Sequence, residues 1–223
     1  MILSNALEKI KRYNQLCVHY NLAADGVYRE RASIKDLFGT DYLPYIVAAL
    51  ISFDLGRMMG PGPEERYDLH ANGFARNFYS KLQHIKLSIG HLLDVRLCNA
   101  NLSSEKANII VAYDELASAG KNSLHQERKQ FHVGATKILH FINPELFVII
   151  DSNTARAFRA SHGIRYLDST QPGYSAEKYF NCLEYAKTDL INFGVKEFCS
   201  LEKGSPMARI YDKLSWATGA GWF

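Results

Sequence analysis

The sequence lacks the spacings that mark metal and disulfide-rich proteins. Its eight histidines form no His-Glu-x-x-His pair, and no two cysteines are arranged as Cys-x-x-Cys. A zinc knuckle, an iron–sulfur loop and a metalloprotease site therefore have no support. We expect no metal ion and no other cofactor. The cysteines stand far apart in the chain, at Cys17, Cys98, Cys182 and Cys199.

Long hydrophobic runs are also missing. The longest apolar stretch, Tyr42–Phe53, is shorter than the about 20 residues that a membrane-spanning helix needs. Residues 1–14 become charged after the first few positions and lack the apolar core of a secretory signal. The sequence therefore predicts a cytoplasmic protein with no membrane partner.

The charge balance is only mildly basic. A net charge of +3 and a pI near 8.6 permit contact with nucleic acid but do not require it. With 223 residues, 47% of them hydrophobic, the chain can bury a core as one large domain or as two lobes. Composition alone leaves the class of partner open.

Signals for β-strands are scarce. Only Phe147–Ile150 has strand composition, and a four-residue run without a partner is expected to be a buried extended link. We predict a mainly α fold, an orthogonal helical bundle with little or no sheet. Residues 1–223 are expected to form a single domain, and the Pro-Gly segment 59–64 marks where two lobes would divide.

Apolar residues recur at helical spacing along most of the chain. A first helix is expected behind Ser4 as N-cap, ending at Asn21–Gly26. A last helix is expected behind Ser205, with Pro206 in its first turn, and Arg209 and Asp212 should pair along it. The helices predicted between these two cover Ser33–Phe38, Tyr42–Met58, Phe74–Leu93, Ser103 or Ser104 to Leu116, Ala135–Ile142, Ser152–Ser161 and Ser175–Phe193.

The segment Val133–Phe158 is the one that suggests chemistry. A glycine precedes an apolar helix, and a hydrophobic run then leads to Asp151 at the start of the next helix. At a helix N-terminus a carboxylate meets free backbone N–H groups and the positive end of the helix dipole. The pattern predicts an ionised aspartate beside a water-poor wall.

This segment resembles the helix-hairpin-helix DNA glycosylases of the endonuclease III superfamily. The matching residues are Val133–Gly134, Lys137, Ile149–Asp151, Asn153 and Arg156, and Asp-x-Asn-x-x-Arg is similar to the segment with the catalytic aspartate of adenine-mismatch glycosylases. The resemblance implies a helix-hairpin-helix-like element, binding to duplex DNA, and hydrolysis of an N-glycosidic bond.

The resemblance also assigns roles to particular residues. Asp151 would stabilise the positive charge that develops on the sugar as the base leaves. Lys137 would be the amine nucleophile of a lyase reaction, although the family's lysine position, counted from Gly134, falls on Thr136. Hydrolysis is therefore favoured over lyase chemistry. The DNA contacts implied are the amides at Gly134, which would hold a phosphate, together with Arg128, Lys129, Asn153 and Arg156.

Structural explanations stand beside each of these roles. Asp151 is also a good N-cap, Lys137 suits a solvated helix face, and Arg156 suits a pair with a carboxylate. Two alternatives to the glycosylase thus remain: a non-catalytic helical module that binds nucleic acid or protein, and a helical structural protein. The aromatic tail, which contains Trp216 and Trp222, is expected either to pack on the body or to contact a second copy in a homodimer.

Overall fold

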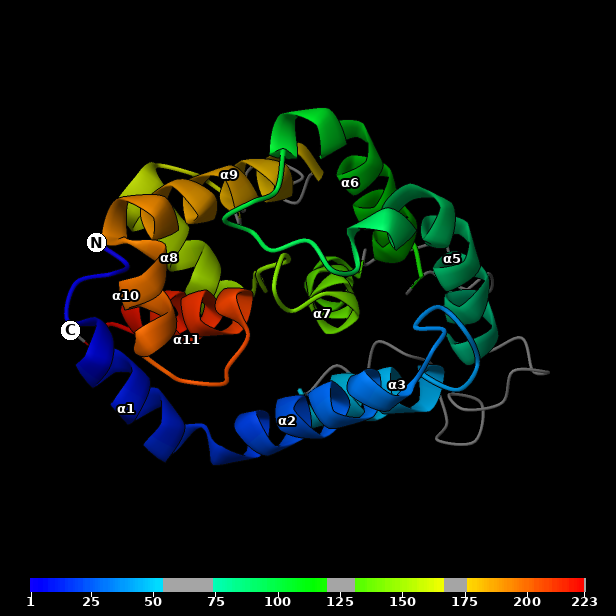
Figure 1. Ribbon diagram of the computed structural model, residues 1–223, viewed down its shortest axis with the longest axis horizontal. Helices are drawn as coiled ribbons and strands as arrows, with labels where there is room; N and C mark the ends of the chain where they lie inside the picture. Colours follow the sequence, from blue (N-terminus) through cyan, green and yellow to red (C-terminus); the bar gives the residue numbers. More distant parts are fainter. Residues whose placement is uncertain (54–73, 120–130, 167–175, 223) are drawn as a thin grey trace.

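The computed structural model describes residues 1–53, 74–119, 131–166 and 176–222 (Figure 1). Throughout these ranges the regular structure is helical, without a strand, which confirms the mainly α prediction. The Pro-Gly segment 59–64 lies outside the described residues, so the lobe boundary stays a prediction. None of the described helices is long and apolar enough to cross a membrane.

The first three helices run along one side of the molecule: α1 (Ala6–Leu16), α2 (Val18–Ser33) and α3 (Leu43–Ser52) (Figure 1). Helix α1 begins behind Asn5, whose left-handed backbone has φ 50°, and not behind Ser4 as predicted. The predicted helix end at Asn21–Gly26 is wrong, because these residues lie inside α2. The predicted helix Ser33–Phe38 is also wrong, because α2 ends at Ser33 and a non-helical connection follows.

Helix α5 (Phe74–Ile89) is followed by a 3-10 turn, η2 (Gly90–Leu92), and then by α6 (Leu102–Ala117). Helices α5 and α6 pack against each other. The predicted helix Phe74–Leu93 is thus confirmed except for its last turn. The N-cap of α6 is Asn101, whose side chain accepts a hydrogen bond from the Ser104 N–H at 3.4 Å. The serine caps predicted for this helix were therefore two to three residues too late.

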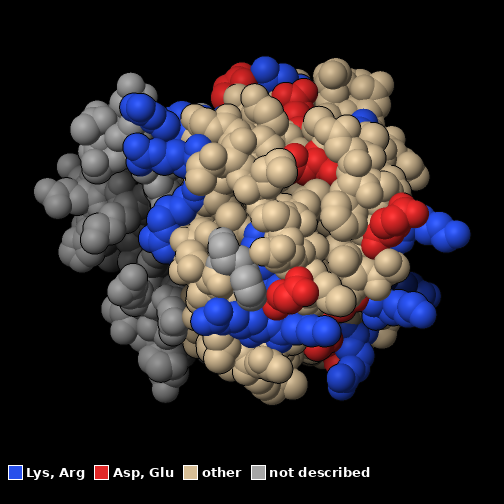
Figure 2. Space-filling view, turned by 90° about the vertical axis from the view of Figure 1, so that its left-hand side faces the viewer, with Lys and Arg blue, Asp and Glu red and all other residues tan. Residues whose placement is uncertain are grey.

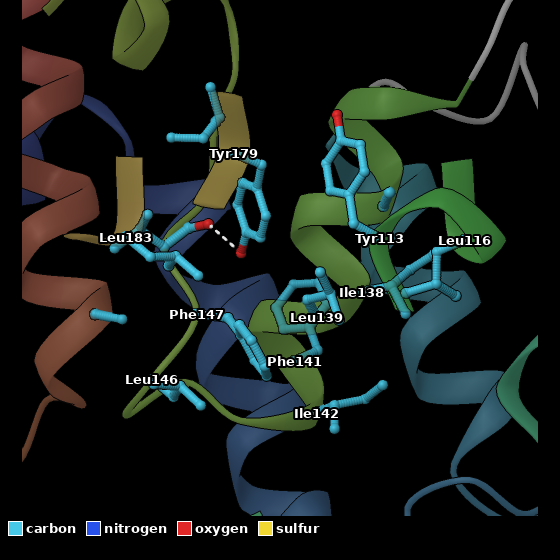
Figure 3. Close-up of a cluster of buried hydrophobic side chains, with 14 of the residues drawn as sticks. Tyr113, Leu116, Ile138, Leu139, Phe141, Ile142, Leu146, Phe147, Tyr179 and Leu183 are labelled. Carbon is cyan, nitrogen blue, oxygen red and sulfur yellow. Dashed lines mark hydrogen bonds between the residues drawn. The ribbon is translucent and has the colours of Figure 1, made fainter. Parts of the chain in front are cut away.

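Helix α7 (His132–Ile142) lies in the middle of the molecule, and all of its residues except Val133 are buried (Figure 1). It packs against α2, α3 and α6. Its apolar side chains, including Ile138 and Leu139, lie between Tyr113 of α6 and Tyr179 of α9 (Ala176–Phe193) (Figure 3). Helix α7 is therefore the central helix of the core, and the polar side chains that it carries are buried together with the apolar ones.

Two buried histidines of α7 are hydrogen-bonded within this core. His140 Nδ1 lies 2.7 Å from the Phe147 carbonyl oxygen, and His140 Nε2 lies 2.5 Å from the Tyr28 hydroxyl. A carbonyl can only accept, so Nδ1 carries the hydrogen and the neutral ring accepts at Nε2 from Tyr28. Burial lowers the pKa of His140 to about 3. The second histidine, His132, contacts the Tyr113 hydroxyl at 3.1 Å.

The C-terminal part contains α8 (Ser152–His162), α9, α10 (Val195–Ser200) and α11 (Met207–Gly219). The ends of α8, α9 and α11 match the predicted helices within two residues, and α10 was not predicted. The N-cap of α11 is Pro206 and not Ser205, so this helix begins one residue later than predicted. Helix α11 packs along both α8 and α1, which brings the two ends of the chain to the same side of the molecule (Figure 1).

Candidate functional site

The segment before Asp151 is a buried, non-helical link whose backbone is held by side chains of neighbouring helices. The Thr136 hydroxyl of α7 accepts from the Ile150 N–H at 3.1 Å, and the Tyr179 hydroxyl of α9 donates to the Val148 carbonyl at 3.2 Å (Figure 3). His140 donates to Phe147 in the same way. Buried backbone groups outside helices and sheets need such partners. The link is therefore fixed in place, as is the residue that follows it.

Asp151 is the N-cap of α8. Its Oδ1 accepts from the backbone N–H groups of Asn153 and Thr154, both at 2.9 Å. These two bonds orient the carboxylate and place it at the positive end of the helix dipole. The predicted helix start is confirmed, and the aspartate also lines a pocket.

This pocket has a volume of about 300 Å³ and lies between segments that are far apart in the chain. Two aromatic pairs form part of its wall. Tyr13 and Trp216 meet edge to face with ring centroids 5.5 Å apart, and Tyr20 and Phe53 are stacked at 5.0 Å. The lining residues are Tyr13, Tyr20, Phe53, Val133, Lys137, Ile149, Asp151, Ser152, Asn153, Asp212 and Trp216.

Lys137 reaches the same pocket from α7. Its side chain is buried, and its Nζ lies 4.2 Å from the centre of the Phe53 ring. A cation over an aromatic face is stabilised by the negative charge of that face. Thr136 is the residue onto which the resemblance places the family's lysine. Its hydroxyl accepts a hydrogen bond from the Ile150 N–H, and it is not among the residues that line the pocket.

A second carboxylate, Asp212 of α11, was not predicted as a site residue. It is buried in contact with Arg209, which confirms the pairing expected for these two residues. Arg209 also donates to the Tyr13 hydroxyl at 3.3 Å and to Asn21 Oδ1 at 2.9 Å. Burial and, to a smaller degree, the charge of Asp151 raise the pKa of Asp212 to about 6, against the opposing effects of Arg209 and Lys137.

The remaining predicted site residues are divided between the pocket and other places. Asn153 lines the pocket, and its Oδ1 accepts a hydrogen bond from Arg156. Arg156 is exposed and also donates from Nε to the Gly219 carbonyl oxygen at 3.0 Å. This arginine therefore ties α8 to the end of α11. Arg128 and Lys129 lie outside the described residues.

Gly134 lies in the first turn of α7 and is buried against its neighbour Phe131. A Cβ at this position would come within 2.0 Å of the Phe131 ring. Packing thus requires glycine here, and binding of a phosphate by its amide stays a prediction. The helix-hairpin-helix element likewise stays a prediction, because residues 120–130 between α6 and α7 are not among those described.

On the face that Figure 2 shows, Lys and Arg side chains form separate groups with a mostly uncharged area between them. Within the described residues no three His, Cys, Asp or Glu side chains are grouped so that they could hold a metal ion.

Comparisons of the chain with protein-family models, with curated proteins and with solved structures find no match.

Proposed function

We propose that this protein hydrolyses an N-glycosidic bond in DNA and takes the target nucleotide into the pocket of Asp151. The observation that carries the proposal is the meeting of Asp151 and Lys137 in one pocket with two aromatic pairs. Enzymes that act on a base in duplex DNA must extrude the nucleotide and stack its base against aromatic or apolar side chains. The resemblance of Val133–Phe158 to the glycosylases supports the same assignment.

Asp151 has the properties that bond cleavage needs. As the base leaves, positive charge grows on the deoxyribose, and a fixed carboxylate nearby lowers the energy of that state. The two amide hydrogen bonds to Oδ1 hold this carboxylate in place before the substrate arrives. The buried link behind it and the aromatic side chains around it supply the apolar part of the pocket wall.

Lys137 has a secondary role in this proposal. In its neutral form an amine at this place could attack the sugar and form a Schiff base, which would add a lyase step. Its ammonium form, over the Phe53 ring, would instead contact the phosphate or the base. Trapping with borohydride separates the two roles: a covalent protein–DNA adduct that is absent in Lys137→Met supports the lyase step.

The decisive experiment compares the wild type with Asp151→Asn on duplex oligonucleotides that carry a panel of damaged or mismatched bases. Asparagine caps a helix as well as aspartate does, so we expect normal stability. We expect release of the base, measured as the formation of abasic sites, to be about 100-fold slower, because the negative charge that stabilises the sugar cation is lost. Asp189→Asn is the matched control, since Asp189 contacts His162 and Tyr211 away from the pocket.

Two results would refute the catalytic proposal. Equal rates of base release by the wild type and Asp151→Asn would show that the aspartate is not catalytic. Absence of cleavage on every duplex, together with binding that weakens steeply with salt, would favour the non-catalytic nucleic-acid module instead.

A further inference from the structure

The pocket holds a second carboxylate that comes from a different element than the first. Asp151 stands at the start of α8, whereas Asp212 lies in the middle of α11. Each of them lines the pocket, and each is held by its own set of donors. Asp151 is held by backbone amides and Asp212 by the guanidinium of Arg209.

The surroundings of Asp212 are unlike those of Asp151. Asp212 is almost fully buried, and Arg209, which is buried with it, is fixed by Tyr13 and Asn21. The next cation along α11, Lys213, pairs with Glu202 at 2.8 Å and not with Asp212. Ionisable groups from several elements surround Asp212. They are Tyr13 of α1, Cys17 between α1 and α2, Tyr28 of α2, Lys137 of α7, Asp151 at the N-cap of α8, and Arg209 of α11 itself.

We propose that Asp212 is the catalytic base of the reaction, an inference that rests on the proposed function. Its carboxylate accepts a proton from a water molecule as the water oxygen bonds to C1′ of the sugar. The C1′–N bond breaks at the same time, and its electron pair leaves with the base. The proton on Asp212 then passes through solvent to the departed base, so that the products are an abasic sugar and a neutral base.

This division of roles follows from the two environments. Pairs of carboxylates at glycosidic bonds commonly divide the work between stabilising the sugar cation and handling the proton. A base is most effective when its pKa lies close to the working pH. The pKa of Asp212 is raised to about 6, so this carboxylate is still ionised at neutral pH but binds a proton more readily than an ordinary aspartate.

The same property predicts a pH dependence. As the pH falls through about 6, Asp212 takes up a proton and can no longer accept one from water. The cleavage rate of the wild type should therefore fall about tenfold for each pH unit below that value. The Tyr13 hydroxyl keeps its proton throughout this pH range, because burial raises its pKa above its ordinary value.

The test measures the single-turnover rate of base release, from pH 5 to pH 8.5, on an oligonucleotide from which the wild type releases a base. The proteins compared are the wild type, Asp212→Asn, Asp212→Glu and the control Asp189→Asn. We expect Asp212→Asn to be about 100-fold slower at pH 7.5 and to lose the fall in rate at low pH. Asp212→Glu should recover part of the rate together with the pH dependence, whereas Asp189→Asn should match the wild type.

Each other outcome has a defined meaning. If Asp212→Asn cleaves like the wild type or keeps the fall at low pH, Asp212 is not the base, although the proposed function stands as long as Asp151→Asn is impaired. If Asp212→Asn does not fold, as judged by circular dichroism, a wild-type rate that stays level from pH 7 to pH 5 overturns the inference. If the wild type releases a base from none of the duplexes, both the proposed function and the role of Asp212 fail.

Discussion

The backbone of Gly219 lies directly against the carbonyl group of Asn153. A Cβ on Gly219 would come within 1.7 Å of the Asn153 carbonyl oxygen. Only glycine therefore permits the end of α11 to approach the first turn of α8 this closely. The contact sets the position of the turn that begins with Asp151.

The first prediction concerns Gly219→Ala. The new methyl group meets backbone atoms, which cannot rotate away, so α8 and α11 must separate. We expect the free energy of unfolding to fall by about 2 kcal/mol or more, as measured by urea denaturation. A change below 0.5 kcal/mol would show that the two helices do not pack as described.

The second prediction compares two other glycines in helices. In Gly134→Ala the methyl group collides with the buried Phe131 ring, so we expect a loss of about 1–3 kcal/mol. In Gly26→Ala nothing lies within 4 Å of the new atom, and alanine favours a helix by up to about 1 kcal/mol over glycine. The two variants should thus change the unfolding free energy in opposite directions, and a gain in both would contradict the packing of Phe131.

The third prediction tests how the link before Asp151 is held. Thr136→Val keeps the side-chain volume but leaves the buried Ile150 N–H without its acceptor, so we expect a loss of about 1–3 kcal/mol. Thr136→Ser keeps the hydroxyl and should recover most of that stability. Hydrogen exchange at the Ile150 amide provides a local measurement, and equal protection in Thr136→Val and the wild type would argue against this bond.

The fourth prediction concerns pH and His140. The folded protein holds this ring neutral, with its pKa lowered to about 3, whereas the unfolded chain protonates it near its ordinary value of about 6.5. Its stabilising contribution is therefore complete above pH 6.5 and is lost as the pH falls toward 3. The stability difference between the wild type and His140→Gln, measured by urea denaturation, should shrink from pH 8 to pH 5.

The sequence predicted best those helices whose apolar residues form a continuous stripe. Helices α5 and α9 fall where this spacing places them. Helix α2 was missed because only Ala24 and Val27 are buried along it, so it has no such stripe, and Gly26 suggested a break. A helix that is stabilised mainly by its neighbours leaves little local signal.

The candidate site was predicted only where its signal is local. Asp151 followed from its place before a helix and Asn153 from the motif, whereas Tyr20 and Trp216 reach the pocket through packing between distant helices. From the sequence, Asp212 was interpreted only as the partner of Arg209, three residues away, in an ordinary ion pair. Its position in the pocket depends on how α11 lies against α1 and α8, which no short stretch of sequence encodes.

Both tryptophans of the chain belong to one place. Trp216 lines the pocket, and the ring of Trp222 lies 5.0 Å from it, beneath the guanidinium of Arg12. Fluorescence excited at wavelengths that only indoles absorb therefore comes from Trp216 in the pocket wall and from Trp222 in contact with it. The protein thus carries an intrinsic fluorescent reporter of occupancy, and small compounds that enter can be detected by quenching without any added label.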